Sequence, residues 1–117
     1  MNLHLELKDK IEAHYAGQLT GDAVLKQDAL LVTFDDGVQL ELRYPNPEEY
    51  SIAWLWGSAL MRVDTSPMHE GLASFPNHFH DLDGNAREDR ITKPGRDPWD
   101  NVRSLVDAIR KDPCLTA

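Results

Sequence analysis

Histidine is concentrated in one short stretch of this sequence. Three of the five histidines, His69, His78 and His80, lie there, and Arg62 and Asp64 precede them. Imidazole changes its charge near neutral pH, so one histidine of a close pair can act as general base while the other acts as general acid. Phosphodiester transesterification needs both roles. We therefore expect any chemistry of this chain to be concentrated in the stretch Arg62–His80.

Arg62 and Asp64 are two residues apart in a segment predicted to be a strand, so their side chains project from the same face. The planar guanidinium of Arg62 could bind an anionic group, and Asp64 could orient that guanidinium or a nearby histidine. The alternative is a solvated strand face or a surface ion pair. Arg62 is a candidate substrate-binding residue, as is Asn77, which precedes the run His78-Phe79-His80.

His78 and His80 lie on one side of a predicted extended segment, whereas Phe79 points the other way, into the core. One histidine of this pair could accept a proton and the other donate it, with His69 nearby. The bland alternative is that the histidines hold an ordered loop to the sheet by hydrogen bonds. The candidate catalytic residues are Arg62, Asp64, His69, His78 and His80.

Metal ligation is a further interpretation of the same cluster. His69, His78 and His80 could bind zinc or a similar transition metal, because imidazole is a common ligand of such ions. A carboxylate could complete the shell, from Asp64, Glu70 or Asp81. The sequence contains no phosphate loop, dinucleotide-binding motif, nucleophile elbow or CxxC pair, and we expect no cofactor.

The elements that must position these residues fit one domain, because 117 residues leave no room for a second core. The sequence predicts an α+β fold, an antiparallel β-meander of about four strands with an N-terminal and a C-terminal helix packed against it. In chain order we expect an N-terminal helix in residues 1–18, the meander in 22–64, a histidine-rich loop region in 65–97 and the C-terminal helix in 97–112.

The helices are predicted from apolar spacing and capping residues. Leu7, Ile11 and Tyr15 recur at helical spacing, and Gly17 follows them. Near the other end of the sequence, Asp97 can cap a helix that has Pro98 at its first position. Four apolar residues form the stripe of this second helix, namely Trp99, Val102, Val106 and Ile109.

The strands are predicted from alternation and turns. Ala29–Phe34 is followed by the hairpin signature Asp35-Asp36-Gly37, after which apolar and polar residues alternate until Pro45-Asn46-Pro47, where we expect the strand to stop. Ser51–Trp56 and Ala59–Asp64 are two further strands. Ile52, Trp54 and Trp56 are expected on one face, and tight turns imply antiparallel pairing.

Composition restricts the class of protein. A single cysteine, Cys114, excludes an intrachain disulfide and favours a reducing compartment, and no apolar run reaches membrane-spanning length, so we expect a cytoplasmic protein. The net charge of −8 argues against broad nucleic-acid binding. Residues 62–117 nevertheless hold two-thirds of the 12 Lys and Arg residues, which leaves room for a local phosphate site.

The central block resembles the TumE-like toxin family of prokaryotic toxin–antitoxin modules over roughly residues 20–110. Members carry an Arg-x-Asp-Asn-Ala-Pro-His-His stretch and then a Phe-Pro-His-His-Lys-His stretch. The corresponding segments here are Arg62-Val-Asp64-Thr-Ser-Pro67-Met-His69 and Phe75-Pro76-Asn77-His78-Phe79-His80. Thr65 stands where the family tends to have Asn, Met68 and Asn77 where it tends to have His, and Phe79 where it has a basic residue.

The resemblance implies a toxin-like protein, and three functions are considered for it. As a small metal-independent ribonuclease, it would hold the phosphate with Arg62, exchange a proton through His78 and His80, and orient one imidazole with Asp64. As a diverged, non-catalytic relative, it would bind a helix-turn-helix antitoxin or another partner. As a metal protein, it would use the three clustered histidines. The edge strands could also pair into a homodimer.

Overall fold

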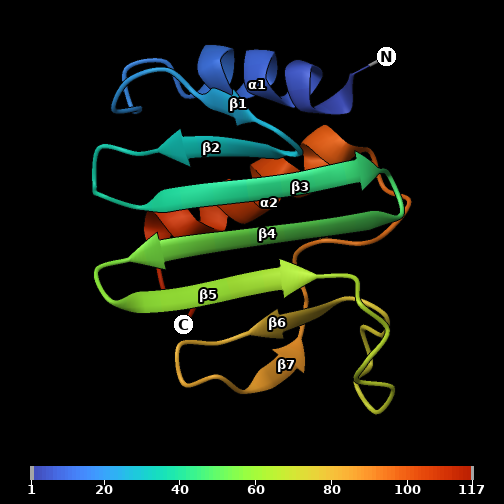
Figure 1. Cartoon of the computed structure of the whole chain (residues 1–117). Helices are drawn as coiled ribbons and strands as arrows, with labels where there is room; N and C mark the ends of the chain where they lie inside the picture. The colour runs from blue at the N-terminus through green and yellow to red at the C-terminus, as the bar shows by residue number, and fades with distance from the viewer. Residues whose placement is uncertain (1, 117) are drawn as a thin grey trace.

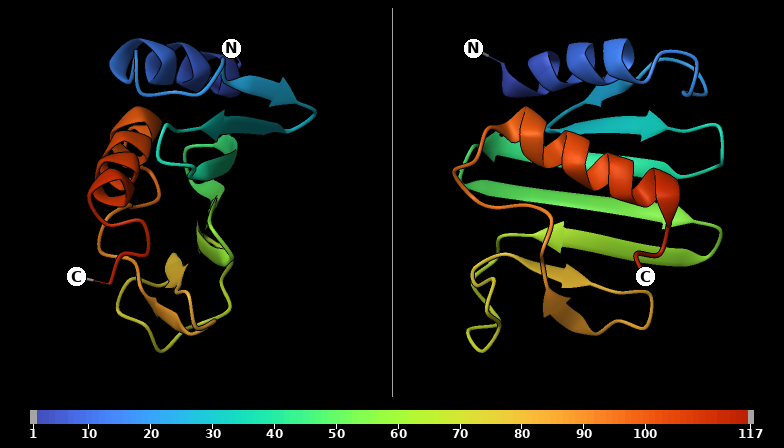
Figure 2. Two further views of the ribbon diagram at one scale, coloured as in Figure 1. Left: turned by 90° about the vertical axis from the view of Figure 1, so that its left-hand side faces the viewer. Right: turned by 180° about the vertical axis from the view of Figure 1, so that it is seen from behind.

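The computed structural model describes residues 2–116 and consists of one antiparallel sheet and two helices. The seven strands lie in the sheet in the same order as in the chain, and each pairs with its neighbours in sequence (Figure 1). Helix α2 crosses one face of the sheet, and α1 lies at the β1 end (Figure 2). The elements are α1 Leu3–His14, β1 Val24–Lys26, β2 Ala29–Thr33, β3 Gln39–Asn46, β4 Glu49–Trp56, β5 Ala59–Asp64, β6 His78–His80, β7 Ala86–Glu88 and α2 Pro98–Lys111.

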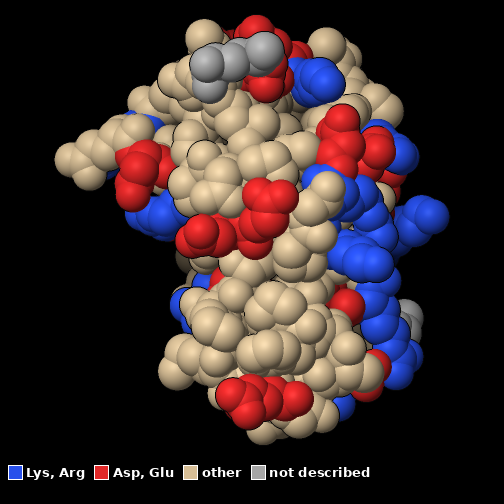
Figure 3. Space-filling view, turned by 90° about the vertical axis from the view of Figure 1, so that its right-hand side faces the viewer, with Lys and Arg blue, Asp and Glu red and all other residues tan. Residues whose placement is uncertain are grey.

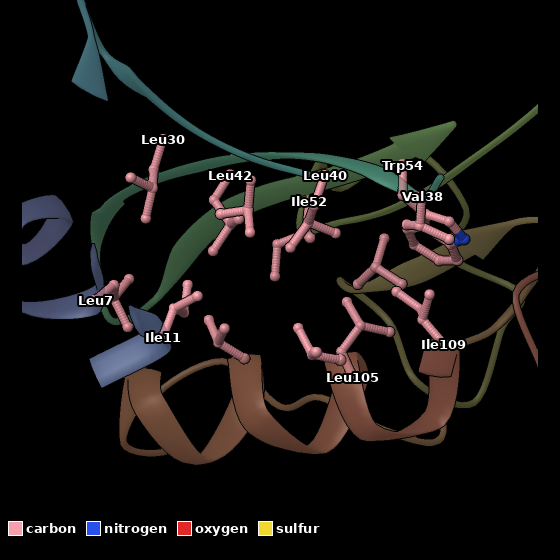
Figure 4. Packing of buried hydrophobic residues seen from close by; sticks show 14 of the residues in the cluster. Leu7, Ile11, Leu30, Val38, Leu40, Leu42, Ile52, Trp54, Leu105 and Ile109 are labelled. Carbon is pink, nitrogen blue, oxygen red and sulfur yellow. The ribbon is translucent and has the colours of Figure 1, made fainter. Parts of the chain in front are cut away.

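The β2–β3 hairpin follows the alternation of the sequence. Gly37 has a φ of +92°, which a residue with a side chain rarely adopts, and this explains the glycine in the turn. Leu30 pairs with Leu42 and Val32 with Leu40, so that these four side chains share the core face. Figure 4 shows the sheet residues pointing toward Leu105 and Ile109 of α2, with which they form the buried core.

The α+β class is confirmed, but the expectation of about four strands is wrong because the sheet has seven. Two of the additional strands, β6 and β7, fall within the predicted loop region 65–97, and the third is β1. Each of the three has only three residues. A strand that short shows hardly any alternation, so its pairing with a neighbouring strand, rather than a local pattern, defines it.

Strand β3 ends at Asn46, within the Pro45-Asn46-Pro47 stretch where the sequence predicts it to stop, and its pairing with β4 is irregular between Arg43 and Asn46. Such an irregularity tolerates a proline, which has no N–H to contribute to the ladder. Trp56, expected on the buried face, is 42% exposed at the end of β4.

Helix α2 begins at the cap that its sequence predicts, and both helices contribute buried residues to the core. Asp97 caps α2, since its Oδ1 accepts a hydrogen bond from the Trp99 N–H at 2.8 Å, and Pro98 occupies the first turn. The stripe of α2 also includes Leu105, which is fully buried. Tyr15, just after α1, donates a hydrogen bond to Asp107 of α2 at 2.7 Å and so joins the two helices. Neither helix is long and apolar enough to cross a membrane.

A buried polar network fixes the segment that leads into β6. The amide nitrogen of Asn77 donates to Asp89 Oδ2 at 2.9 Å and to the Thr92 carbonyl at 2.8 Å. The Tyr50 hydroxyl and Thr92 Oγ1 are 2.7 Å apart, which connects this network to β4. Buried polar groups need such partners to offset the loss of water. The network therefore holds β6, and with it His78 and His80, in register beside β5.

Candidate active site

Cross-strand pairing between β5 and β6 brings the chemical groups together. Arg62 lies opposite His80, and Asp64 lies opposite His78. The intervening pair, Val63 and Phe79, faces the core, and the Phe79 ring stacks on Trp54 with 6.0 Å between ring centroids. Because side chains alternate along a strand, the polar residues emerge on the face away from α2. No helix of the described chain covers that face (Figure 2).

The side chains make direct contacts on this face. Arg62 Nε donates to Asp64 Oδ2 at 2.7 Å, and Arg62 Nη2 lies 3.3 Å from His80 Nε2. The Nε2 atoms of His78 and His80 are 2.9 Å apart. His69, from the segment between β5 and β6, adds a third imidazole, with ring centroids 4.7 Å from His78 and 5.9 Å from His80. We call these five residues the His/Arg cluster.

Asp64 is the buried centre of the His/Arg cluster. Its Oδ2 accepts from Arg62, and its Oδ1 accepts from the Ser66 N–H at 3.0 Å and lies 3.1 Å from His78 Nε2. Three donors therefore surround the carboxylate, which compensates for its removal from water. Asp64 consequently fixes the positions of Arg62 and His78 relative to each other.

His78 is almost completely enclosed, with its side chain 2% exposed. Its Nδ1 lies 3.2 Å from the carbonyl oxygen of Pro76, and its Nε2 faces Asp64. Acceptors on both sides of the ring therefore fix the orientation of His78, and its Nε2 also lies 2.9 Å from Nε2 of His80.

His80 is in a different environment. Its side chain is 25% exposed. Burial lowers the pKa of His80 below its ordinary value, and the positive charge of Arg62 lowers it further. A neutral His80 can accept a proton.

Exposure divides the His/Arg cluster into two layers. Arg62, with its side chain 49% exposed, and the partly exposed His69 and His80 can be reached from solvent. Asp64 and His78 lie behind them. A cavity of about 950 Å³ lies on the opposite face of the sheet, where Val63 and Phe79 contribute to its wall. The exposed side chains of the His/Arg cluster therefore lie on the sheet face opposite this cavity.

Three of the sequence-predicted residues lie outside the His/Arg cluster. Asn77 is buried in the network that holds residues 89–92, so its amide points away from solvent. Asp81 accepts hydrogen bonds from Arg87 and from the N–H groups of the β6–β7 turn, and these bonds lower its pKa. Glu70 is exposed. Metal-ligand atoms of His69, His78 and His80 all lie within 4.8 Å of one another.

Two backbone groups belong to the site and escaped sequence reasoning. The Ser66 N–H supports Asp64, and the Pro76 carbonyl orients His78. Every residue except proline has both groups, so residue types give no signal for them. The pattern Asp-x-Ser, in which a carboxylate accepts from the N–H two residues on, is the nearest available hint.

The fold and site define a small α+β protein with a polar histidine and arginine cluster on an open antiparallel sheet. The protein-family model described as "Toxin TumE" matches residues 7–112, nearly the whole chain. The chain therefore belongs to the TumE toxin family, and membership of a toxin family implies an antitoxin partner. Neither the comparison with curated proteins nor that with solved structures gave a match.

Proposed function

We propose that this TumE-family toxin cleaves RNA by metal-independent transesterification at the His/Arg cluster. The observation that carries the proposal is the cross-strand arrangement of Arg62 opposite His80 and of Asp64 opposite His78. It combines a cation suited to phosphate with two imidazoles in different environments. No redox group or external nucleophile is needed, because RNA supplies its own 2′-hydroxyl.

The exposed layer of the His/Arg cluster can account for the reaction. Arg62 binds the non-bridging oxygens of the phosphate. Neutral His80 accepts the proton of the 2′-hydroxyl as the 2′-oxygen bonds to phosphorus, and His69 donates a proton to the departing 5′-oxygen as the P–O5′ bond breaks. The products are a 2′,3′-cyclic phosphate and a 5′-hydroxyl end.

The buried layer then has a positioning role. His78 is too enclosed to touch a bound chain directly, but its Nε2 lies 2.9 Å from that of His80. Asp64 holds His78 and Arg62 in place through contacts of 3.1 and 2.7 Å. In this proposal His80 takes the base role that the sequence suggested for the His78 and His80 pair, His69 acts as the acid, and His78 orients His80.

The departure from the family at Phe79 does not remove a phosphate contact. Phe79 faces the core, on the opposite side of the sheet from Arg62 and His80. A basic side chain at this position would therefore not reach a phosphate bound at the His/Arg cluster. The substitution is therefore weaker evidence for an inactive relative than the sequence comparison alone suggests.

Most Lys and Arg side chains lie away from the His/Arg cluster. They gather along one margin of the face that Figure 3 presents, with some Asp and Glu among them. The segment between β7 and α2, which carries the exposed residues Arg90, Lys93 and Arg96, lies on the α2 side of the sheet (Figure 2). The proposed site therefore depends on Arg62 for its phosphate contact, and with a net charge of −8 we expect weak, salt-dependent affinity for RNA.

The test is cleavage of a defined RNA oligonucleotide by the purified chain in the presence of a chelator. We expect the wild type to leave cyclic phosphate ends, and His80→Ala to lower the rate by at least about 100-fold, the usual range for loss of a general base. His14→Ala, which removes a histidine outside the His/Arg cluster, is the matched control. An oligonucleotide with a single 2′-deoxy position should resist cleavage there.

A non-catalytic binding role is the second candidate function, and the burial of His78 and Asp64 favours it. In that case these two residues stabilise the β5–β6 pair, and toxicity arises from binding alone. Induction in growing cells separates the candidates. Growth arrest without RNA loss, unchanged in His80→Ala, would support the binding role, whereas arrest with RNA loss only in the wild type supports cleavage.

A further inference from the structure

We propose that His69, His78 and His80 form a binding site for a divalent transition metal of the zinc type, and that the bound metal blocks cleavage. The second half of this proposal rests on the proposed ribonuclease activity, whereas the first half stands on geometry alone. The metal acts here as an inhibitor that competes for the imidazoles. It takes no part in the reaction.

The distances suit a tetrahedral metal centre. Ligand atoms of the three histidines lie within 4.8 Å of one another, and two of them, Nε2 of His78 and of His80, are 2.9 Å apart. Zinc–nitrogen bonds of about 2.0–2.1 Å place tetrahedral ligands about 3.3 Å from one another. His69 must therefore approach by roughly 1–2 Å, and the segment between β5 and β6 that carries it is partly exposed.

Asp64 lies beside two of the three histidines and can offer a fourth ligand. Its Oδ1 is 3.1 Å from His78 Nε2, and its Oδ2 is 3.6 Å from His80 Nε2. Because each of these contacts is made by a different oxygen, the carboxylate must shift for one oxygen to complete a tetrahedral set. A carboxylate also offsets part of the charge of a divalent cation. Three imidazoles with one carboxylate oxygen suit zinc and its neighbours better than calcium or magnesium, which prefer all-oxygen ligand sets.

A second observation that supports the metal site is the hydrogen-bonding contact of the other ring nitrogen of His78. Its Nδ1 faces the Pro76 carbonyl at 3.2 Å, which directs Nε2 toward the other imidazoles. Histidines that bind metals usually donate their second ring N–H to a carbonyl or carboxylate in this manner, which fixes the orientation of the ring. The buried half of the proposed site is therefore already aligned.

Arg62 competes with the metal for the same position. Its Nη2 lies 3.3 Å from His80 Nε2, where the positive charge would repel a cation. The side chain is half exposed, so the guanidinium can turn into solvent while Asp64 remains in place. Metal binding then uses the lone pair with which His80 would accept a proton. Cleavage and metal binding are mutually exclusive uses of these atoms.

Titration of the purified full chain, prepared without a histidine tag, with Co²⁺ tests the site itself. We expect one equivalent to produce the intense visible absorption of tetrahedral cobalt, and Zn²⁺ to displace it. His69→Ala should weaken binding by at least about 10-fold, because it removes a direct ligand, whereas His14→Ala should bind as the wild type does. Circular dichroism checks that both variants remain folded.

Absence of the cobalt bands, or equal affinity of the His69→Ala and His14→Ala variants, would overturn the metal site. RNA cleavage assayed with and without one equivalent of Zn²⁺ tests the inhibition. Loss of cleavage with zinc and its return with chelator support the proposal. Cleavage that requires zinc refutes both the inhibition and the metal-independent mechanism. Metal binding without cleavage under any condition leaves the site standing and refutes the proposed function.

Discussion

A lysine can be introduced on either face of the β5–β6 pair, and we expect it to lower stability on the core face and to strengthen RNA binding on the other. Phe79→Lys introduces the kind of residue that the TumE toxin family tends to have at this position, but on the core side of the sheet. Leu60→Lys introduces the same charge on the side of the His/Arg cluster, two residues before Arg62. Leu60 is 63% exposed, whereas Phe79 is buried against Trp54.

The expected magnitudes follow from this burial. Truncation of a buried phenylalanine costs about 3–5 kcal/mol. The aliphatic stem of lysine recovers part of that contact while its ammonium reaches water through the neighbouring cavity. We therefore expect Phe79→Lys to lower the free energy of unfolding by about 3 kcal/mol, a drop in Tm of about 10 °C for a domain of this size. Leu60→Lys should change it by less than about 0.5 kcal/mol.

Thermal unfolding and RNA binding at two salt concentrations measure the two effects. Leu60→Lys should tighten RNA binding and make it more dependent on salt, by about one additional phosphate contact. Phe79→Lys should leave the RNA affinity of each folded molecule unchanged. The reasoning is refuted if Phe79→Lys is as stable as the wild type and binds RNA more tightly, since position 79 would then face the phosphate.

Two further predictions concern carboxylates. Asp64→Asn replaces a carboxylate that accepts from three donors by an amide, and we expect urea denaturation to show that the free energy of unfolding falls by about 3 kcal/mol. The control is Glu41→Gln, at an exposed ion pair with Arg43, which should cost less than about 1 kcal/mol. Equal losses in the two variants would contradict the central role of Asp64. The hydrogen bond from Arg87 lowers the pKa of Asp81, so the native state binds fewer protons than the unfolded state. The stability that Asp81 contributes should therefore be present above about pH 4 and be lost on further acidification. Denaturation of Asp81→Asn from pH 7 to pH 2.5 should show a deficit that shrinks below pH 4, and a constant deficit would contradict this assignment.

Local sequence patterns were sufficient for the long strands and for α2. The alternation after Gly37 places Val38, Leu40 and Leu42 on the buried face, where the structure has them. Asp97 and Pro98 likewise mark the start of α2 because capping depends on residues adjacent in sequence. In these elements the pattern that defines the structure lies among neighbouring residues, so it can be recognised in a single sequence.

The site depends on information that is not local. The residue types Arg62, Asp64, His78 and His80 predict a cluster, but the register that sets Asp64 opposite His78 is determined across the intervening segment 65–77. The inward turn of Asn77 is equally hidden, because its partners Asp89 and Thr92 come after β7. Periodicity describes one strand at a time and cannot report which residues of two strands meet.

The order of strands in the sheet has a consequence for how the chain folds. Every strand pairs with its neighbour in sequence, from β1 to β7, so each hairpin closes only a modest loop. Chains dominated by such short-range pairings fold faster than those whose pairings join distant segments. Helix α2 follows all seven strands in the chain, yet it supplies Val102, Leu105 and Ile109 to the core. During synthesis the β5–β6 pair can therefore form before the opposite face of the sheet acquires its cover.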